Sequence, residues 1–222
     1  MKFLKPGMDY LRTLREEEKE FLTKVYEDCK TDMPTGRTEV CWLNLHIRNE
    51  FTLKTFAHNE ALHQFVLRLL EEAYEDYPEQ FPARHILNYG FIVNPQGSTK
   101  TQHFHCDYSE TSSNLFIPMT KVTVFNAPQF LPEELKIARL DGDCNYGRHP
   151  EDIMEEEGVD FLVVNQVISK PWTLLRLNPH TPHRGIPNRD NYDRLMFFVT
   201  IDPVYKDLSE TTTYNETLAI HK

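Results

Sequence analysis

The sequence lacks the features that define several large classes of protein. It has no apolar run long enough to span a membrane, and its first residues, MKFLKPGMDYL, lack the apolar segment of a signal peptide. Its 4 cysteines are scattered and form no C-x-x-C pair, so neither a disulfide framework nor a redox motif is indicated. We therefore expect a cytoplasmic protein that does not interact with a membrane.

Basic residues are also scarce. The chain has 24 Lys and Arg against 34 Asp and Glu, a formal net charge of −10, and no cluster of basic side chains. Proteins that bind nucleic acid normally present such a cluster to the phosphates, so we expect no nucleic-acid partner. An acidic surface suits a neutral or cationic small molecule better than an acyl-CoA.

The 222 residues, 40% of them hydrophobic, fit one domain that spans 1–222 without repeats or an evident linker. Its first part, residues 1–84, reads as a helical support segment. Apolar residues recur at helical spacing over residues 9–30 and again over 59–78, where Pro78 ends the pattern. Between the two helices, an alternating run over residues 38–47 predicts a strand.

The pattern changes at residue 85, after which short β-rich runs alternate with turn residues. Strands that follow helices, rather than alternating with them, indicate an α+β, mainly β fold, with helices packed outside an antiparallel sandwich or barrel. The runs that we expect to be strands cover residues 85–95, 101–108, 114–125, 160–168, 172–178 and 195–202.

The segment TQHFHCDYSE places metal-ligating groups at alternating positions, His103, His105 and Asp107. In a strand such residues lie on one face. Read as H-x-D, the segment suits a mononuclear iron site. Read as H-x-H-x-D, it resembles part of the motif of metallo-β-lactamase-like dizinc hydrolases, which normally continues with a His where this chain has Tyr108.

A third ligand is expected from the later segment NPHTPHRGIPNRDNYDRL. His183 ends a short extended piece, and residues 185–193 are rich in turn formers. A hairpin at this turn brings Arg194 back beside His183, whereas the competing ligand His180 has only Arg189 in the turn itself. An iron bound by two His and one Asp keeps positions open for a keto acid and O₂, and Arg suits the far carboxylate of that acid.

These segments together resemble a known family. HFHCDY, TPHRGIPN, the Arg that lies eleven residues after His183, and VTVFNAPQFLP are similar to the phytanoyl-CoA dioxygenase-like branch of the Fe(II)/2-oxoglutarate oxygenases. The resemblance covers residues 85–202 and implies a double-stranded β-helix, or jelly-roll, core. It implies that His105, Asp107 and His183 bind Fe(II), and that Arg194 binds 2-oxoglutarate.

The resemblance also implies the reaction. 2-Oxoglutarate and O₂ become succinate and CO₂ while a substrate C–H bond is hydroxylated, with ascorbate as a reductant. Gly185 stands where relatives often carry a hydroxyl residue that contacts 2-oxoglutarate, so Thr123 or Tyr89 is a candidate replacement. Gln102 is a weaker candidate for a pocket contact, and residues 133–160 form an insertion that we expect to be part of a lid.

Two alternatives stay open, a dizinc hydrolase built on His103, His105 and Asp107, and a non-catalytic jelly-roll that binds a ligand. A further segment, residues 141–152, partly matches a calcium loop but lacks its glycine, so a solvated loop is the simpler interpretation. The sequence favours an oxygenase that hydroxylates a small molecule, such as an amino-acid-like metabolite. It does not exclude a protein or peptide substrate.

Overall fold

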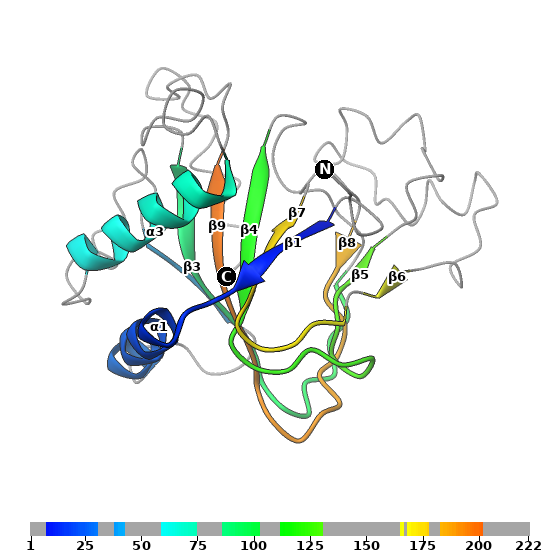
Figure 1. Ribbon diagram of the computed structural model, residues 1–222. Coiled ribbons are helices and arrows are strands. Elements are labelled where there is room, and N and C mark those ends of the chain that lie inside the picture. The colour runs from blue at the N-terminus through cyan, green and yellow to red at the C-terminus, as the bar shows by residue number, and fades with distance from the viewer. Residues whose placement is uncertain are drawn as a thin grey trace, which may run out of the picture.

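The chain folds into two antiparallel sheets with helices on one side. The computed structural model describes residues 8–30, 38–42, 59–74, 86–102, 112–130, 165–166, 168–177 and 183–201. Helices α1 and α3 cover one face of a large sheet, and a small sheet lies on its other side (Figure 1). This arrangement confirms the prediction of a mainly β protein with its helices outside.

The large sheet has six strands in the order β1-β7-β4-β9-β3-β2, and the small sheet has three in the order β6-β5-β8. Within the described residues, no helix is long and apolar enough to cross a membrane. The elements are β1 (Met8–Thr13), α1 (Glu16–Cys29), β2 (Thr38–Trp42), α3 (Asn59–Ala73), β3 (Ile86–Asn94), β4 (Ser113–Pro118), β5 (Gln129–Phe130), β6 (Asn165–Gln166), β7 (Thr173–Leu177), β8 (His183–Arg184) and β9 (Arg194–Ile201).

The helix predicted over residues 9–30 is wrong in its first third. Met8–Thr13 is a strand that pairs with β7, and the helix begins only at Glu16. Leucines at positions 11 and 14 fit a helix, but the free edge of β7 offers backbone partners that local spacing does not reveal. The three Glu residues of the first turn of α1 then lie where a helix dipole favours negative charge.

Other expected elements are confirmed. The second helix is α3, and the runs 85–95, 172–178 and 195–202 are β3, β7 and β9. The run 114–125 is shorter than expected, because β4 ends at Pro118, which cannot donate to a sheet ladder. Residues 101 and 102, which begin the predicted strand 101–108, are not in a strand, and the rest of that run and the insertion 133–160 lie outside the described residues.

The main core lies between the helices and the outer face of the large sheet. Side chains that alternate along β3 and β9, such as Phe91 and Phe197, meet the apolar stripe of α3. Their rings are 5.4 Å apart edge to face, and the Phe65 ring of α3 is 6.3 Å from Phe197. Burying each such side chain contributes about 1.5–3 kcal/mol, so this layer supplies most of the stabilisation.

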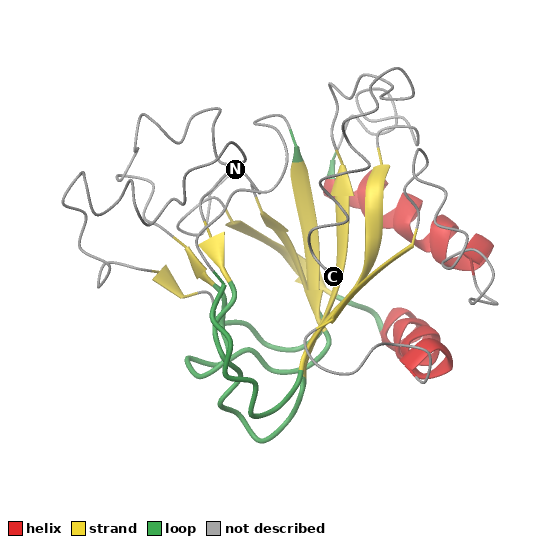
Figure 2. Ribbon diagram, turned by 180° about the vertical axis from the view of Figure 1, so that it is seen from behind, coloured by secondary structure: helices red, strands yellow, loops and turns green. Residues whose placement is uncertain are grey.

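The other residues of the same strands face the small sheet, and we call this side of the large sheet the inner face. Phe116, Leu175 and Leu177 pack there against Phe130 of β5. Loops at one end of the sandwich join the two sheets (Figure 2). The inner face is therefore the surface on which residues from both sheets meet.

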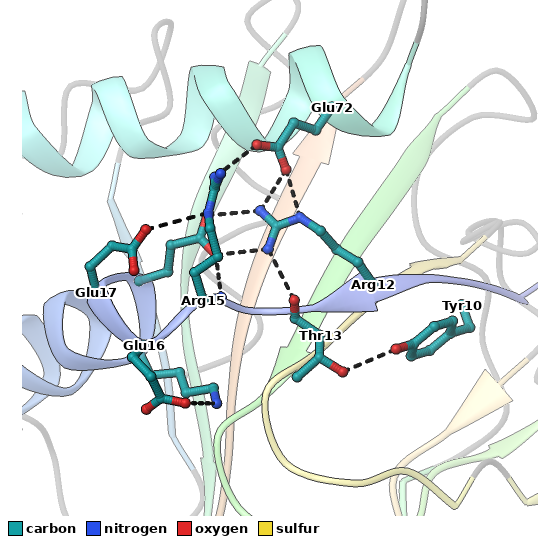
Figure 3. A network of polar contacts seen from close by, with 9 residues as sticks. Tyr10, Arg12, Thr13, Arg15, Glu16, Glu17 and Glu72 are labelled. Atoms are coloured by element: carbon teal, nitrogen blue, oxygen red, sulfur yellow. Dashed lines mark hydrogen bonds and ion pairs between the residues drawn. The ribbon is translucent and has the colours of Figure 1, made fainter.

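An ion-pair network joins β1 to both helices (Figure 3). Arg12 donates to both carboxylate oxygens of Glu18, at 2.7 and 2.8 Å, and its Nε donates to Glu72 at 2.6 Å. Arg15 adds contacts of 2.9 and 3.0 Å to the same two carboxylates. Burial raises the pKa of Glu18, but the hydrogen bonds from Arg12 and Arg15 outweigh it and lower this pKa to about 2.

We predict that Glu18→Gln lowers the free energy of unfolding by about 2–3 kcal/mol at neutral pH. The pKa of Glu18 is depressed in the folded state, so its stabilisation is complete above its ordinary pKa of 4.5 and is lost as the pH falls toward 2. Urea unfolding across that range should show the gap between wild type and variant closing. The matched control is Glu17→Gln, whose side chain is 74% exposed, and it should change stability by less than about 0.5 kcal/mol.

Candidate active site

The predicted ligand His183 begins β8 in the small sheet. Its Cα partner across the ladder is Phe130 of β5, so both side chains lie on the same face. The two rings are stacked, with centroids 5.6 Å apart and planes at 26°. His183 is only 9% exposed, and Phe130 belongs to the cluster on the inner face. The imidazole is therefore held between the sheets and not in solvent.

The start of the H-x-D segment lies beside this strand. The backbone N–H of Gln102 donates to the carbonyl of Gly185 at 2.9 Å, and the N–H of Gly185 donates to Oε1 of Gln102 at 2.9 Å. Gln102 is three positions before His105, and Gly185 is two after His183. The reciprocal pair thus places Gln102, near the start of the segment TQHFHCDYSE, beside the strand of His183.

Arg194, the predicted co-substrate anchor, is the first residue of β9 and is 2% exposed. Its Cα partner is Asn94, the last residue of β3. One Nη1 hydrogen is donated to the carbonyl oxygen of Asn126, a buried residue in the loop before β5. The guanidinium is thus positioned by backbone from two other segments.

The expected turn after His183 is present, but the expected hairpin is wrong. Strand β8 belongs to the small sheet and β9 to the large one, so residues 185–193 cross from one sheet to the other. A two-stranded hairpin requires adjacent strands in one ladder, and turn-forming composition alone does not distinguish the two arrangements. His183 and Arg194 consequently lie in facing sheets.

A buried asparagine fixes this crossing. The Asn188 side chain donates to the carbonyls of Asn94 at 2.9 Å and Tyr192 at 2.7 Å, and its own oxygen accepts from the N–H of Asp190 at 3.2 Å. The amide of Asn94 in turn donates to the carbonyl of Ile186 at 3.0 Å. These bonds attach the crossing segment to the end of β3, directly beside Arg194.

The turn that follows β3 completes the attachment. The hydroxyl of Ser98 accepts from the N–H of Asn188 at 3.0 Å, and the N–H of Gly97 donates to the carbonyl of Asn188 at 2.9 Å. Gly97 has φ +70°, a left-handed conformation that a residue with a Cβ adopts only at a cost. Sequence analysis missed Asn94 and Asn188; the turn-rich string around Asn188 was the only signal.

The two other candidates for 2-oxoglutarate lie in different places. The N–H of Thr123 donates at 3.0 Å to Oδ1 of Asn126, the residue whose carbonyl accepts from Arg194. The Thr123 hydroxyl donates to Asp190 at 2.6 Å and accepts from the N–H of Phe125. Tyr89 faces the helical layer, where its hydroxyl is 3.4 Å from Nδ1 of His63. Burial raises the pKa of Tyr89 well above its usual range. The structure therefore brings Gln102 next to the strand of His183, but places Tyr89 on the opposite face of the large sheet from Arg194.

The remaining predicted ligands, His103, His105 and Asp107, and the competing His180 lie outside the described residues. Among the residues that are described, no group of three metal-ligating side chains occurs. What the structure contributes to a metal site is thus one buried, ring-stacked imidazole and the backbone pair at Gln102. An uncharged, oriented imidazole is the form in which His binds a metal.

Comparison with known proteins identifies the fold. No protein-family model matches the sequence, and no curated protein matches it. Solved structures do match. SnoK, a non-haem α-ketoglutarate-dependent carbocyclase from nogalamycin biosynthesis, superposes with a TM-score of 0.61 at 13% identity, over 96% of this chain and 87% of SnoK.

Two further structures agree. HygX from Streptomyces hygroscopicus, with nickel and 2-oxoglutarate bound, gives a TM-score of 0.57 at 13% identity, covering 90% of this chain and 83% of HygX. EvdMO1 gives 0.59 at 15% identity over 89% of this chain, which spans only 47% of EvdMO1. At these identities the similarity is one of fold alone, and the chain shares this fold with SnoK, HygX and EvdMO1.

We predict that Asn188→Ala lowers the free energy of unfolding by about 2–3 kcal/mol, because it leaves three backbone groups without their partner. Chemical denaturation measures this. The control is Asn191→Ala in the same crossing segment, where the side chain is exposed and the expected change is below about 0.5 kcal/mol. Equal effects of the two substitutions would contradict the role given to Asn188.

Proposed function

We propose that the protein is an Fe(II)- and 2-oxoglutarate-dependent oxygenase that hydroxylates a small molecule. The observation that carries the proposal is the reciprocal hydrogen-bonded pair between Gln102 and Gly185. It fixes Gln102, three positions before the proposed ligand His105, beside the strand of His183, and this supports a common site for the two segments.

The order of the strands supports a double-stranded β-helix. Strand β3 lies in the large sheet. The chain then passes the small sheet, where Gln102 is hydrogen-bonded to Gly185 beside β8, before β4 enters the large sheet again. Strands β5 and β6 follow in the small sheet. Strand β7 is then in the large sheet, β8 in the small and β9 in the large. Alternation of this kind between two facing antiparallel sheets is the jelly-roll pattern.

In this proposal His105, Asp107 and His183 hold the metal. Two imidazoles and one carboxylate suit a non-haem Fe(II) that keeps coordination positions open. When bound, the iron supplies the activation of O₂, coupled to conversion of 2-oxoglutarate to succinate and CO₂. The chain's own contribution on the His183 side is orientation, because the Phe130 ring stacked on the imidazole restricts its rotation.

Arg194 is the proposed partner of the far carboxylate of 2-oxoglutarate. A guanidinium is permanently charged, and its planar fork matches a carboxylate in two parallel hydrogen bonds. Burial of Arg194 to 2% exposure strengthens such an interaction, since little water competes for the charge. Its contact with the Asn126 carbonyl and its place at the start of a central strand hold the fork in one orientation.

The neighbouring structures are consistent with this assignment. HygX has been solved with nickel, 2-oxoglutarate and hygromycin B bound, which supports a small molecule as the substrate here. The narrower assignment to the phytanoyl-CoA dioxygenase-like branch rests on the sequence resemblance alone. The dizinc alternative lacks the His that its motif normally has at position 108, where this chain has Tyr108.

We predict that anaerobic addition of Fe(II) and then 2-oxoglutarate produces the visible metal-to-ligand charge-transfer band of the chelate. Asp107→Ala and His183→Ala should abolish the band. Arg194→Lys should keep it but weaken 2-oxoglutarate affinity by at least about tenfold, because a point charge replaces a two-pronged contact.

The matched control is Arg189→Lys, which alters the exposed guanidinium that the alternative ligand His180 would require. It should leave the affinity unchanged. A folded, metal-loaded wild type that shows no band would refute the proposed function, and an effect confined to Arg189→Lys would move the anchor to that residue.

We further predict that Phe130→Leu lowers Fe(II) affinity by up to about tenfold, because the residue that orients a metal ligand is lost while the position stays apolar. Competition with a chromophoric chelator measures the affinity. Phe21→Leu is the control, since Phe21 packs on Phe65 in the helical layer at 5.3 Å. Unchanged affinity in Phe130→Leu would show that stacking does not position His183.

A further inference from the structure

Three polar side chains form a row at one end of the inner face. Thr200 of β9 is the Cα partner of Asn88 on β3 and of Asn114 on β4, so all three lie on one face of adjacent strands. Their exposures are 6% for Asn88, 1% for Thr200 and 2% for Asn114. Apolar residues would be the stable choice at such positions, because burying an amide costs free energy unless it is hydrogen-bonded.

The side-chain oxygen of Asn114 lacks the hydrogen bond that would offset this cost. Its Oδ1 is buried and accepts no hydrogen bond from any described residue. The buried amides of Asn94, Asn126 and Asn188 behave differently, because each is bonded to backbone groups. A carboxamide oxygen accepts up to two hydrogen bonds, so Oδ1 of Asn114 is an acceptor that is available to a bound molecule.

The row lies on the side of the proposed metal. Asn114 is the Cα partner of Leu177, Leu177 packs in one cluster with Phe130, and Phe130 is stacked on His183. Arg194 lies on the same face six residues before Thr200, about 20 Å away along the strand. The co-substrate anchor and the polar row therefore occupy opposite ends of one surface.

An aromatic surface adjoins the row. Phe116 follows Asn114 by two positions on β4 and so faces the same way. Its ring is partly exposed and lies 6.5 Å from that of Phe198, with 35° between the planes. A flat apolar ring beside amide and hydroxyl groups suits a molecule with an apolar face and a polar edge. None of the three row residues carries a charge, so the polar edge that they fit is uncharged, and hydroxyl groups, which both donate and accept, match the amides and the hydroxyl of the row.

We propose that Asn114, with Asn88, Thr200 and Phe116, is the substrate-recognition surface and that it takes a polyhydroxylated ring such as a sugar or cyclitol. Oδ1 of Asn114 accepts from a ring hydroxyl, and the C–H face of the ring lies on Phe116. This rests on the proposed oxygenase function, since it assigns the substrate class of the same site. It replaces the amino-acid-like metabolite that the sequence suggests with a different class of small molecule.

The test measures binding of two hydroxylated rings, myo-inositol and methyl β-D-glucopyranoside, to the full chain with Ni(II) and 2-oxoglutarate added. Tetrahydropyran is the ring without hydroxyls. Saturation-transfer NMR titration should show the hydroxylated rings binding to wild type, with affinity three- to tenfold weaker in Asn114→Leu and in Thr200→Val. Ser113→Ala, the neighbouring residue that faces Tyr74 on the other side of β4, should leave affinity unchanged.

A second readout does not depend on the probes. Removing an unused buried acceptor relieves its desolvation cost, so ligand-free Asn114→Leu should melt about 2–4 °C above wild type. A lower melting temperature would mean that the amide is structural and would overturn the inference. Equal probe affinity in wild type and Asn114→Leu, or stronger binding of tetrahydropyran than of the hydroxylated rings, would also overturn it.

The two proposals fail separately. If Fe(II) and 2-oxoglutarate give their band but neither hydroxylated ring binds, the substrate class is wrong and the oxygenase proposal stands. If the rings bind through Asn114 but no band forms, the recognition surface stands and the oxygenase proposal is wrong.

Discussion

The buried side chain of Asn188 is the constraint on which the proposed site depends. It ties three backbone groups of two segments into one cluster, and this cluster decides where the chain leaves the small sheet and enters the large one. His183 lies on one side of the crossing and Arg194 on the other. Without a fixed crossing, a strand of two residues such as β8 would have little to hold it in register.

The two faces of the large sheet differ in composition and in role. The outer face is apolar and is covered by helices, so its residues contribute to stability through burial. The inner face interrupts apolar packing with Arg194 at one end and with Asn88, Asn114 and Thr200 at the other. A buried polar group costs free energy unless it is hydrogen-bonded, and Oδ1 of Asn114 has no such bond among the described residues. The outer face, fastened by the Arg12 and Glu18 network, contributes stability that offsets this cost.

Much of this fold could be predicted from periodicity. The helical stripe of α3 and the long runs of β3 and β9 follow from their own residues, and β9 was clear because residues 195–199 form a continuous apolar run. Met8–Thr13 could not be recognised as a strand, since its partner β7 lies some 160 residues later and local spacing favours a helix. The local sequence pattern also could not predict which strands belong to which of the two sheets.

The candidate site likewise has features that the sequence could predict and features that it could not. Residue types and spacing made His183 and Arg194 candidates, because the chemistry proposed for the site restricts which side chains can serve. The residues that position them were not visible, since Asn94, Asn126 and Asn188 act through backbone carbonyls that any sequence would supply. An asparagine in a turn-rich string is ordinarily a turn residue, and only the folded chain shows that this one is buried.

The choice between His183 and His180 illustrates how the structure adds to the motif. Both precede an arginine at a plausible spacing, so the sequence alone left the choice to an assumed hairpin, and that hairpin does not form. The preference for His183 survives for a different reason. Its ladder partner Phe130 belongs to the inner cluster, so the alternation of side chains directs the imidazole inward, and the arginine associated with it is buried while Arg189 is exposed. The histidine that binds a metal and the arginine that binds the carboxylate of its co-substrate have to face the same interior space. Of the two arginines, only Arg194 is buried on the inner face.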